Sequence, residues 1–215
     1  NTEKTPPKGD VKFSLTLSEE QKRAKELIIS TPFNFVLGGA GSGKTLVAVQ
    51  IALDLYFKRQ INKIVITRPT VSTENNGFIP GSDKEKMEPW LVPIMDNIIK
   101  VYNKPEIIHA MIETKAIEIV PIAYFRGRTF DDAFCIVDEF QNLTKSQLQM
   151  CIGRLGKGSR MVFTGDNHQI DLKYKSDSAI DDVHKIEHSK WVSKIELLEN
   201  HRHEALAEIL KLLNE

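Results

Sequence analysis

The sequence predicts an α/β fold in which helices cover both faces of a mostly parallel β-sheet. Short segments rich in β-branched and aromatic residues recur along the chain, and segments with helical periodicity lie between or after them. Most of the strand-like segments lack polar alternation, which is typical of central strands in a parallel sheet that is buried on both faces. The predicted strands are residues 34–37, 63–67, 117–122, 134–137, 160–164 and 194–198.

The helices are predicted from their spacing and from their first residues. Ser18 is suited to be an N-cap, because two acidic residues follow it and apolar residues then recur at helical spacing. One long irregular stretch, residues 68–83, contains two glycines and two prolines, and we expect such a long connection to be functional. The other predicted helices are residues 44–58, 84–103, 145–154 and 203–214.

Length and composition indicate one domain with a short tail. The chain has 215 residues, and residues 1–13 carry Pro, Gly and Lys without periodicity. We therefore predict a flexible arm over residues 1–13 and a single domain over residues 14–215. The 29 basic and 29 acidic residues give a formal net charge of zero, which argues against a generally basic nucleic-acid coat.

Two further features bear on the compartment. No apolar run approaches the roughly 18 residues that a membrane-spanning helix needs, so we expect no membrane association. The two cysteines, Cys135 and Cys151, lie in apolar segments and are expected to be buried, reduced thiols. Together these features predict a soluble, cytoplasmic protein.

Residues 38–45 contain the most specific local motif. They read GGAGSGKT, which matches G-x-x-x-x-G-K-[ST] between a predicted strand and a predicted helix. In this context backbone N–H groups and the helix N-terminus bind a polyphosphate, a lysine contacts the β- and γ-phosphates, and a hydroxyl ligates Mg²⁺. The predicted nucleotide-binding residues are Gly38, Gly39, Ala40, Gly41, Ser42, Gly43, Lys44 and Thr45, with Lys44 as the catalytic cation and Thr45 as a metal ligand.

A second strand end carries two acidic residues. The apolar segment FCIV is followed by Asp138 and Glu139. We predict that Asp138 holds Mg²⁺ and that Glu139 orients or deprotonates an attacking water. A carboxylate placed to deprotonate water favours a hydrolase. A small-molecule or nucleotide kinase stays an alternative because kinases share the phosphate loop and this chain length.

A third strand end, VFTGDNHQ, places neutral hydrogen-bonding groups where a γ-phosphate or a water could be sensed, with Thr164 and Gln169 as candidates. A plain polar turn is the alternative. Phosphoryl transfer also gains from a cation on the developing charge. The candidate arginines are Arg68, Arg126, Arg128 and Arg202, and for each the alternative is a structural or solvated charge.

The chain resembles the PhoH family of phosphate-starvation-type ATPases over roughly residues 18 to 205. The resemblance rests on the order and spacing of these segments, which include RPTV, RGRT and TGD-x-x-QIDL. That family is similar to the first RecA-like domain of superfamily-one helicases. The resemblance implies a RecA-like P-loop NTPase domain that binds ATP with Mg²⁺, coupled in some members to RNA. It also implies that Gln21 reads adenine, that Gln169 senses the γ-phosphate, and that Arg202 lies near a late arginine motif. Phe140 departs from the family, which more often has a small residue there.

The partners are predicted from the same resemblance. Superfamily-one motors close their ATP site between two RecA-like domains, and the second domain supplies arginines. We recognise one such domain here, so either hydrolysis is slow or a neighbouring copy supplies the arginine. A repeating head-to-tail contact closes into a ring or extends as a filament, and we expect a homo-oligomeric ring, as a hexamer. Nucleotide-controlled assembly with little turnover is the non-enzymatic alternative.

Single-stranded RNA is a further candidate partner. The stretch 68–83 and the following helix offer cationic and aromatic side chains that could contact a nucleic-acid backbone and its bases. The alternative is that the apolar residues of this helix form one packed face. The residues in question are Arg68, Lys84, Lys86, Trp90 and Tyr102.

Overall fold

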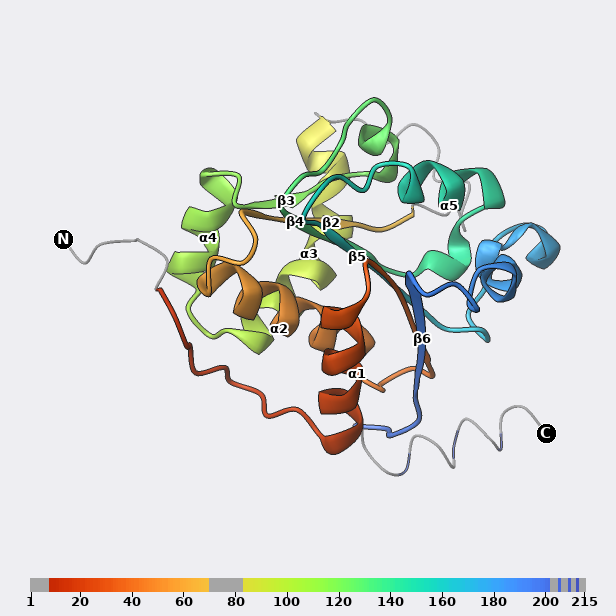
Figure 1. The fold of residues 1–215 in the computed structure, drawn as a ribbon, viewed down its shortest axis with the longest axis horizontal. Coiled ribbons are helices and arrows are strands. Elements are labelled where there is room, and N and C mark those ends of the chain that lie inside the picture. The colour runs from red at the N-terminus through yellow and green to blue at the C-terminus, as the bar shows by residue number, and fades with distance from the viewer. Residues whose placement is uncertain (1–7, 70–82, 202–204, 206–208, 210–211, 213–215) are drawn as a thin grey trace.

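The computed structural model describes residues 8–69 and 83–201 and the isolated positions 205, 209 and 212; over residues 83–91 it describes the course of the helix and not its side chains (Figure 1). Its centre is a six-stranded sheet with the order β3-β2-β4-β5-β1-β6, and every neighbouring pair is parallel. This confirms the predicted sheet. The strands are β1 (Phe33–Gly38), β2 (Lys63–Thr67), β3 (Ile117–Ile119), β4 (Ala133–Val137), β5 (Arg160–Gly165) and β6 (Val192–Leu197).

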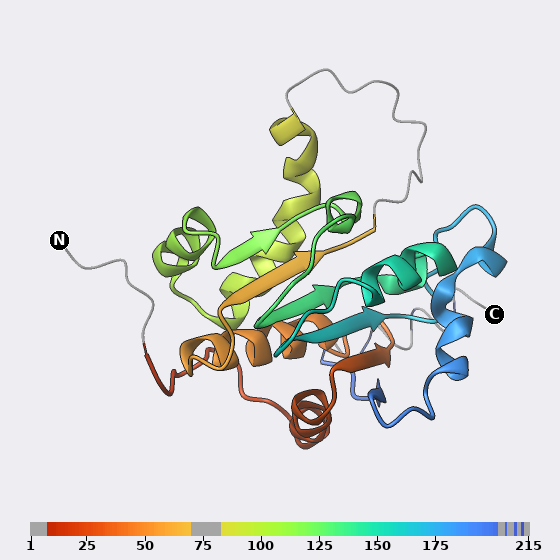
Figure 2. The same cartoon turned by 45° about the horizontal axis from the view of Figure 1, so that its top comes forward.

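Helices cover both faces of this sheet, as predicted. One apolar cluster joins the sheet to α1, α2, α3 and α4, and a second cluster joins its other face to α5 and to short 3₁₀ turns. Figure 2 shows α2 and α5 on opposite sides of the strands. The α-helices are α1 (Glu19–Ser30), α2 (Lys44–Phe57), α3 (Asp83–Val101), α4 (Pro105–Glu113) and α5 (Lys145–Ile152). The 3₁₀ turns are η1 (Ile122–Phe125), η2 (Phe140–Asn142), η3 (Lys175–Asp177) and η4 (Ala179–Lys185).

The two clusters divide each central strand by the alternation of its side chains. In β5, Met161 and Phe163 belong to the cluster beneath α5, whereas Val162 belongs to the cluster beneath α2. Both sets are fully buried. The strands therefore read as continuous apolar runs, because each of their faces is covered.

Residues 8–17 lie against the domain. The Gly9 N–H donates to the carbonyl oxygen of Phe57 at 2.9 Å, and the Ser14 N–H donates to that of Val101 at 2.9 Å. The ring of Phe13 packs edge-on against Tyr102, with 6.2 Å between centroids. Residues 8–13, assigned from the sequence to an arm, thus form no helix or strand but contact α2 and the end of α3.

Several predicted elements change in extent. Strand β3 ends at Ile119 rather than at residue 122, since Pro121 follows and the chain turns into η1. Helix α4 was not predicted; Pro105 is its first residue, where a missing N–H costs nothing. Residues 70–82 and most of the predicted helix 203–214 lie outside the described residues.

Both cysteines are free and buried, as the sequence predicts. Burial raises the pKa of the Cys135 and Cys151 thiols to about 12, which keeps them protonated and unreactive. None of the described helices has both the length and the apolar character needed to cross a bilayer.

Candidate functional site

A cleft of about 700 Å³ lies where the strands of the parallel sheet end. Volumes of this size are typical of small-molecule sites, and the carboxyl edge of a parallel sheet is where such sites form. The cleft is lined by residues 15–18 and 43–47, by parts of α1 and α3, and by the residues that follow β2, β4 and β5. Segments distant in sequence therefore meet at one place.

The loop of residues 38–45 connects β1 to α2. Gly43 precedes the helix with φ of 81°, a left-handed conformation that glycine adopts without a steric penalty. A Cβ on Gly43 would also lie 2.8 Å from Nε2 of Gln21, so a side chain there would collide with the neighbouring wall of the cleft. The loop thus requires glycine at this position, and its backbone forms one end of the cleft.

Lys44 is the first residue of α2 and lies across the loop. Its Nζ donates to the carbonyl oxygens of Gly38 at 2.7 Å and Gly39 at 3.0 Å. The ammonium group is therefore held beside the glycines and the helix N-terminus, where an anion would be stabilised. This is the position that the sequence predicts for a cation facing a polyphosphate.

Asp138 follows β4 and contacts two hydroxyl groups. Its Oδ1 accepts hydrogen bonds from Oγ1 of Thr45 at 2.7 Å and Oγ1 of Thr164 at 2.6 Å. Asp138 is 4% exposed and Thr164 is fully buried. A carboxylate and a hydroxyl are oxygen ligands of the kind that Mg²⁺ takes, alongside waters and substrate phosphates.

The described residues include no cluster of three or more His, Cys, Asp or Glu side chains suited to hold a metal ion. A metal at Thr45 and Asp138 would therefore take most of its ligands from water and phosphate, as Mg²⁺ commonly does. The predicted metal ligands fit that role.

Glu139 lies in the cleft with a left-handed backbone, at φ of 53° and ψ of 42°. Such a conformation in a residue other than glycine costs free energy and is frequent at functional sites. Its Oε2 accepts a hydrogen bond from Nε2 of Gln141 at 2.6 Å, and its Oε1 lies 3.6 Å from Nη2 of Arg68. The Glu139 carboxylate is thus held at the wall of the cleft by Gln141 from behind and by Arg68 within the cleft.

Gln141 was missed by sequence reasoning and connects two strand ends. Its Nε2 also donates to the backbone oxygen of Gln169 at 2.9 Å, and its Oε1 accepts the N–H of Asp166 at 3.1 Å. Gln141 is fully buried. In the sequence, the one sign of such a role was that Gln141 lies two residues after Glu139, the second acidic residue at the end of β4.

Gln169 lies in the same cleft, as predicted. Its Nε2 donates to Oδ2 of Asp166 at 3.0 Å, which aims the amide along the turn after β5. Asp166 is 3% exposed and also lines the cleft. The third strand end therefore contributes two side chains to the cleft.

Gln21 lines the cleft from the first turn of α1. Its Oε1 accepts the N–H of Ser18 at 3.1 Å in a capping box, and its Nε2 donates to the backbone oxygen of Ser42 at 3.4 Å. The ring of His201 lies beside it and also lines the cleft. Sequence reasoning placed Gln21 at the nucleotide through the resemblance but did not place His201 there.

The candidate arginines differ in whether they line the cleft. Arg68 lines the cleft, whereas Arg126 and Arg128 do not. Nη2 of Arg128 lies 2.6 Å from Oε2 of Glu118, and its guanidinium lies 4.8 Å from the centre of the Phe130 ring. Arg128 is therefore bound to other groups of its own domain, away from its own cleft. Arg202 lies outside the described residues.

Phe140 fits behind Glu139. Its ring is fully buried and packs edge-on against Phe35 and Phe163, at centroid distances of 5.4 and 5.9 Å. A Cβ on Gly165 would lie 2.7 Å from this ring. The large side chain is thus accommodated because the end of β5 has none.

The comparisons with known proteins agree with this geometry. The large terminase of a thermophilic bacteriophage superposes with a TM-score of 0.53 at 11% identity, covering 92% of this chain and 50% of that chain. A likeness of this kind shows the fold alone. The parallel sheet and the loop of residues 38–45 between β1 and α2 are those of a RecA-like P-loop NTPase fold.

The relatives are closer in sequence. The PhoH-like protein of Bacillus subtilis is 47% identical over 139 residues, which cover 64% of this chain and 43% of the relative. The PhoH-like protein of Mycobacterium tuberculosis is 37% identical over 201 residues, covering 88% of this chain and 55% of the relative. The chain thus spans about half the length of these curated relatives. A sequence profile of the family described as PhoH-like protein matches residues 15–214, so the chain belongs to the PhoH-like protein family.

Proposed function

We propose that this chain hydrolyses ATP in a Mg²⁺-dependent reaction. The observation that carries the proposal is the 2.7 Å contact between Oγ1 of Thr45 and Oδ1 of Asp138, residues 93 positions apart, with Glu139 in the same cleft. This contact joins a metal-ligating hydroxyl to a metal-ligating carboxylate at the end of the phosphate loop.

The loop and Lys44 would bind the phosphates. Backbone N–H groups of residues 38–45 and the N-terminus of α2 favour a polyanion, and Lys44 would exchange its carbonyl contacts for the β- and γ-phosphates. Thr45 and Asp138 would hold Mg²⁺. When bound, the metal neutralises charge on the β- and γ-phosphates.

Glu139 would act on water. Its carboxylate, held by Gln141 and near Arg68, accepts a proton as the water oxygen bonds to the γ-phosphorus and the bond to the bridging oxygen breaks. Arg68 and Lys44 are the cations at hand to stabilise the charge that develops. The proton then leaves Glu139 for solvent.

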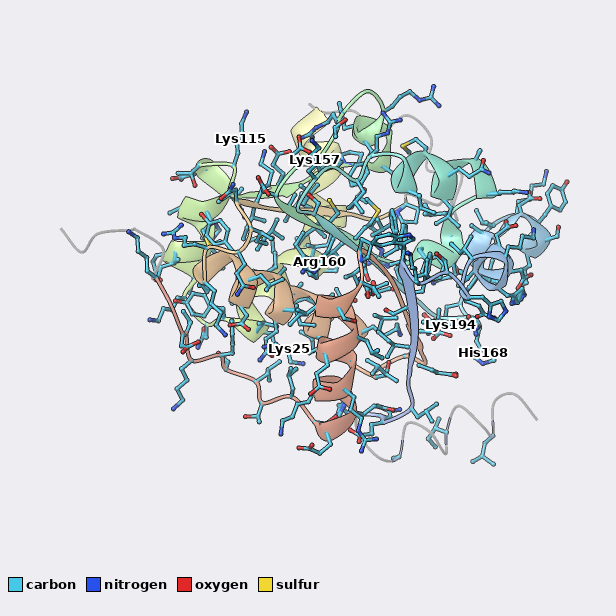
Figure 3. The ribbon with its side chains drawn as sticks, in the orientation of Figure 1. Lys25, Lys115, Lys157, Arg160, His168 and Lys194 are labelled. Carbon is cyan, nitrogen blue, oxygen red and sulfur yellow. The ribbon has the colours of Figure 1, made fainter. Side chains whose placement is uncertain are left out.

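Phosphate release from ATP, with and without Mg²⁺, tests the proposal. Lys44→Ala should lower turnover by about 100-fold or more, since it removes a cation from the transferred group. Lys157→Ala is the matched control: Lys157 is exposed, does not line the cleft and is labelled in Figure 3. Equal turnover in wild type and Lys44→Ala would refute the site.

Glu139→Gln separates hydrolysis from binding. The variant should bind ATP with Mg²⁺ as the wild type does but release little phosphate, whereas the exposed control Glu113→Gln should behave as wild type. A kinase would instead pass the phosphate to an acceptor, which a substrate panel detects. An assembly switch would leave wild-type turnover negligible and oligomerisation dependent on nucleotide.

We further propose that hydrolysis is coupled to RNA and that the chain forms a homo-oligomeric ring. Turnover should rise with single-stranded RNA and with protein concentration, in a sample whose mass is measured by light scattering. Turnover that changes with neither RNA nor protein concentration would favour a monomeric ATPase.

A further inference from the structure

Gln21 and His201 meet at the wall of the cleft although 180 positions separate them: their Nε2 atoms lie 3.1 Å apart. The backbone N–H of His201 donates to the carbonyl oxygen of Gly41 at 3.1 Å. The backbone N–H groups of residues 198–199 donate to the carboxylate of Glu20, at 2.8 and 3.2 Å. Figure 1 shows the chain after β6 reaching the N-terminal end of α1. The segment that carries His201 is therefore tied both to α1 and to the phosphate loop.

The Gln21 amide has one orientation that satisfies its neighbours. Its Oε1 accepts the N–H of Ser18, and its Nε2 donates to the oxygen of Ser42. A flipped amide would set its NH₂ group against the Ser18 N–H and its oxygen against the Ser42 oxygen. The group facing His201 is therefore an N–H donor, and a ring with its proton on Nδ1 offers Nε2 as the acceptor. Oε2 of Glu199 lies 3.7 Å from the same ring nitrogen.

This arrangement limits what Gln21 offers to a ligand. Both amide hydrogens are engaged, by Ser42 and His201, while Oε1 accepts the N–H of Ser18 with one of its two lone pairs. An acceptor suits a base edge with an amino group, such as the 6-amino group of adenine. It repels a carbonyl there, such as O6 of guanine.

We propose that His201 is a positioning residue that sets the base preference of the cleft by engaging the second N–H of Gln21. The proposal rests on the proposed function, in which this cleft binds a nucleotide. His201 contributes because an amide that lost this partner would have an N–H available for O6 of guanine. The preference for ATP over GTP thus depends on a residue beyond the last strand of the sheet.

The phosphate loop supports this arrangement. A Cβ on Gly43 would lie 2.8 Å from Nε2 of Gln21 and 3.7 Å from Cδ2 of His201, so both side chains pack against the last glycine of the loop. The side chain of His201 is 42% exposed, so its ring is held by these contacts and not by burial in the core. Its replacement therefore leaves the core untouched.

The test measures dissociation constants for ATP and for GTP, with Mg²⁺, by calorimetry on the whole chain. His201→Leu should reduce the ratio of the two constants by about 3- to 10-fold, the usual effect of one hydrogen bond. His201→Gln returns an acceptor at the reach of Nε2 and should keep the wild-type ratio. His188→Leu is the matched control, since His188 is exposed and does not line the cleft.

A double-variant cycle tests whether His201 acts through Gln21. In a Gln21→Met background, His201→Leu should change the ratio no further. An unchanged ratio in His201→Leu, a His201→Gln that behaves as His201→Leu, or an equal effect in the Gln21→Met background would each overturn the proposal.

The binding measurement also separates this proposal from the proposed function. A wild type that binds ATP without hydrolysing it contradicts the ATPase and leaves the ratio measurable. A wild type that binds neither nucleotide overturns both.

Discussion

Nε2 of Gln141 donates a 2.6 Å hydrogen bond to Oε2 of Glu139 and, from the same nitrogen, a 2.9 Å bond to the backbone oxygen of Gln169. One buried amide thus fixes both the carboxylate that would act on water and the turn that carries Gln169. The three residues form one unit across two strand ends.

Gln141→Leu should therefore slow turnover by about 10-fold or more, because it removes a hydrogen bond to a charged group. ATP binding should change little, since Gln141 does not line the cleft. Steady-state phosphate release gives the turnover number. Gln149→Leu, exposed on α5, is the control and should match wild type. Normal turnover in the Gln141→Leu variant would refute the positioning role.

Thr164→Val should weaken the proposed Mg²⁺ site. The change keeps the shape of the side chain but removes the hydroxyl that donates to Oδ1 of Asp138. The Mg²⁺ concentration for half-maximal turnover should rise by about 10-fold, as for other partners of metal ligands. Thr114→Val, at the end of α4, serves as the isosteric control. The same Mg²⁺ dependence in both variants would contradict this role.

Gly165→Ala should destabilise the fold by about 1–3 kcal/mol, because the added methyl group would overlap the Phe140 ring. Urea unfolding measures the loss. Gly153→Ala, whose new methyl group would find its nearest neighbour at 3.4 Å, should cost less. Combining Gly165→Ala with Phe140→Leu should cost less than the sum of the two changes; strict additivity would show that the two positions do not interact.

Asp54 should make stability sensitive to acid. Burial alone would raise its pKa, but hydrogen bonds and charges from Lys25 and Lys58, at 2.6 and 3.0 Å, outweigh burial and hold the pKa below its ordinary value of 3.8. Lys25, on α1, is labelled in Figure 3. A carboxyl with a lowered pKa in the folded chain stabilises it above the ordinary pKa and loses that effect as pH falls through the lower value.

Thermal unfolding between pH 7 and pH 3 checks this expectation. Asp54→Asn should be less stable than wild type at pH 7, and the difference should shrink as the pH falls below about 4. Asp177→Asn, at an exposed position, should show the wild-type dependence. A constant difference across the range would contradict the assignment.

Much of this architecture could be predicted because it depends on local patterns. Strands such as β2 and β4 are short apolar runs, and the loop before Lys44 carries its motif within eight residues. The contacts of Gln141 and His201 could not be predicted, because each joins segments that come together only in the folded sheet. Arg128 shows the same limit: its motif marks it for function, but its ion pair with Glu118 depends on the position of β3.

The cleft is completed by both ends of the described chain. Strand β6 pairs with β1, and His201 contacts Gly41 and Gln21, so the walls beside the phosphate loop come from segments that lie far apart in the sequence. A nascent chain whose residues 18–45 have left the ribosome still lacks the wall formed by His201 until residue 201 also emerges. The cleft is therefore completed only after residue 201 has left the ribosome, and a ligand of the cleft would stabilise the finished domain more than any shorter nascent chain.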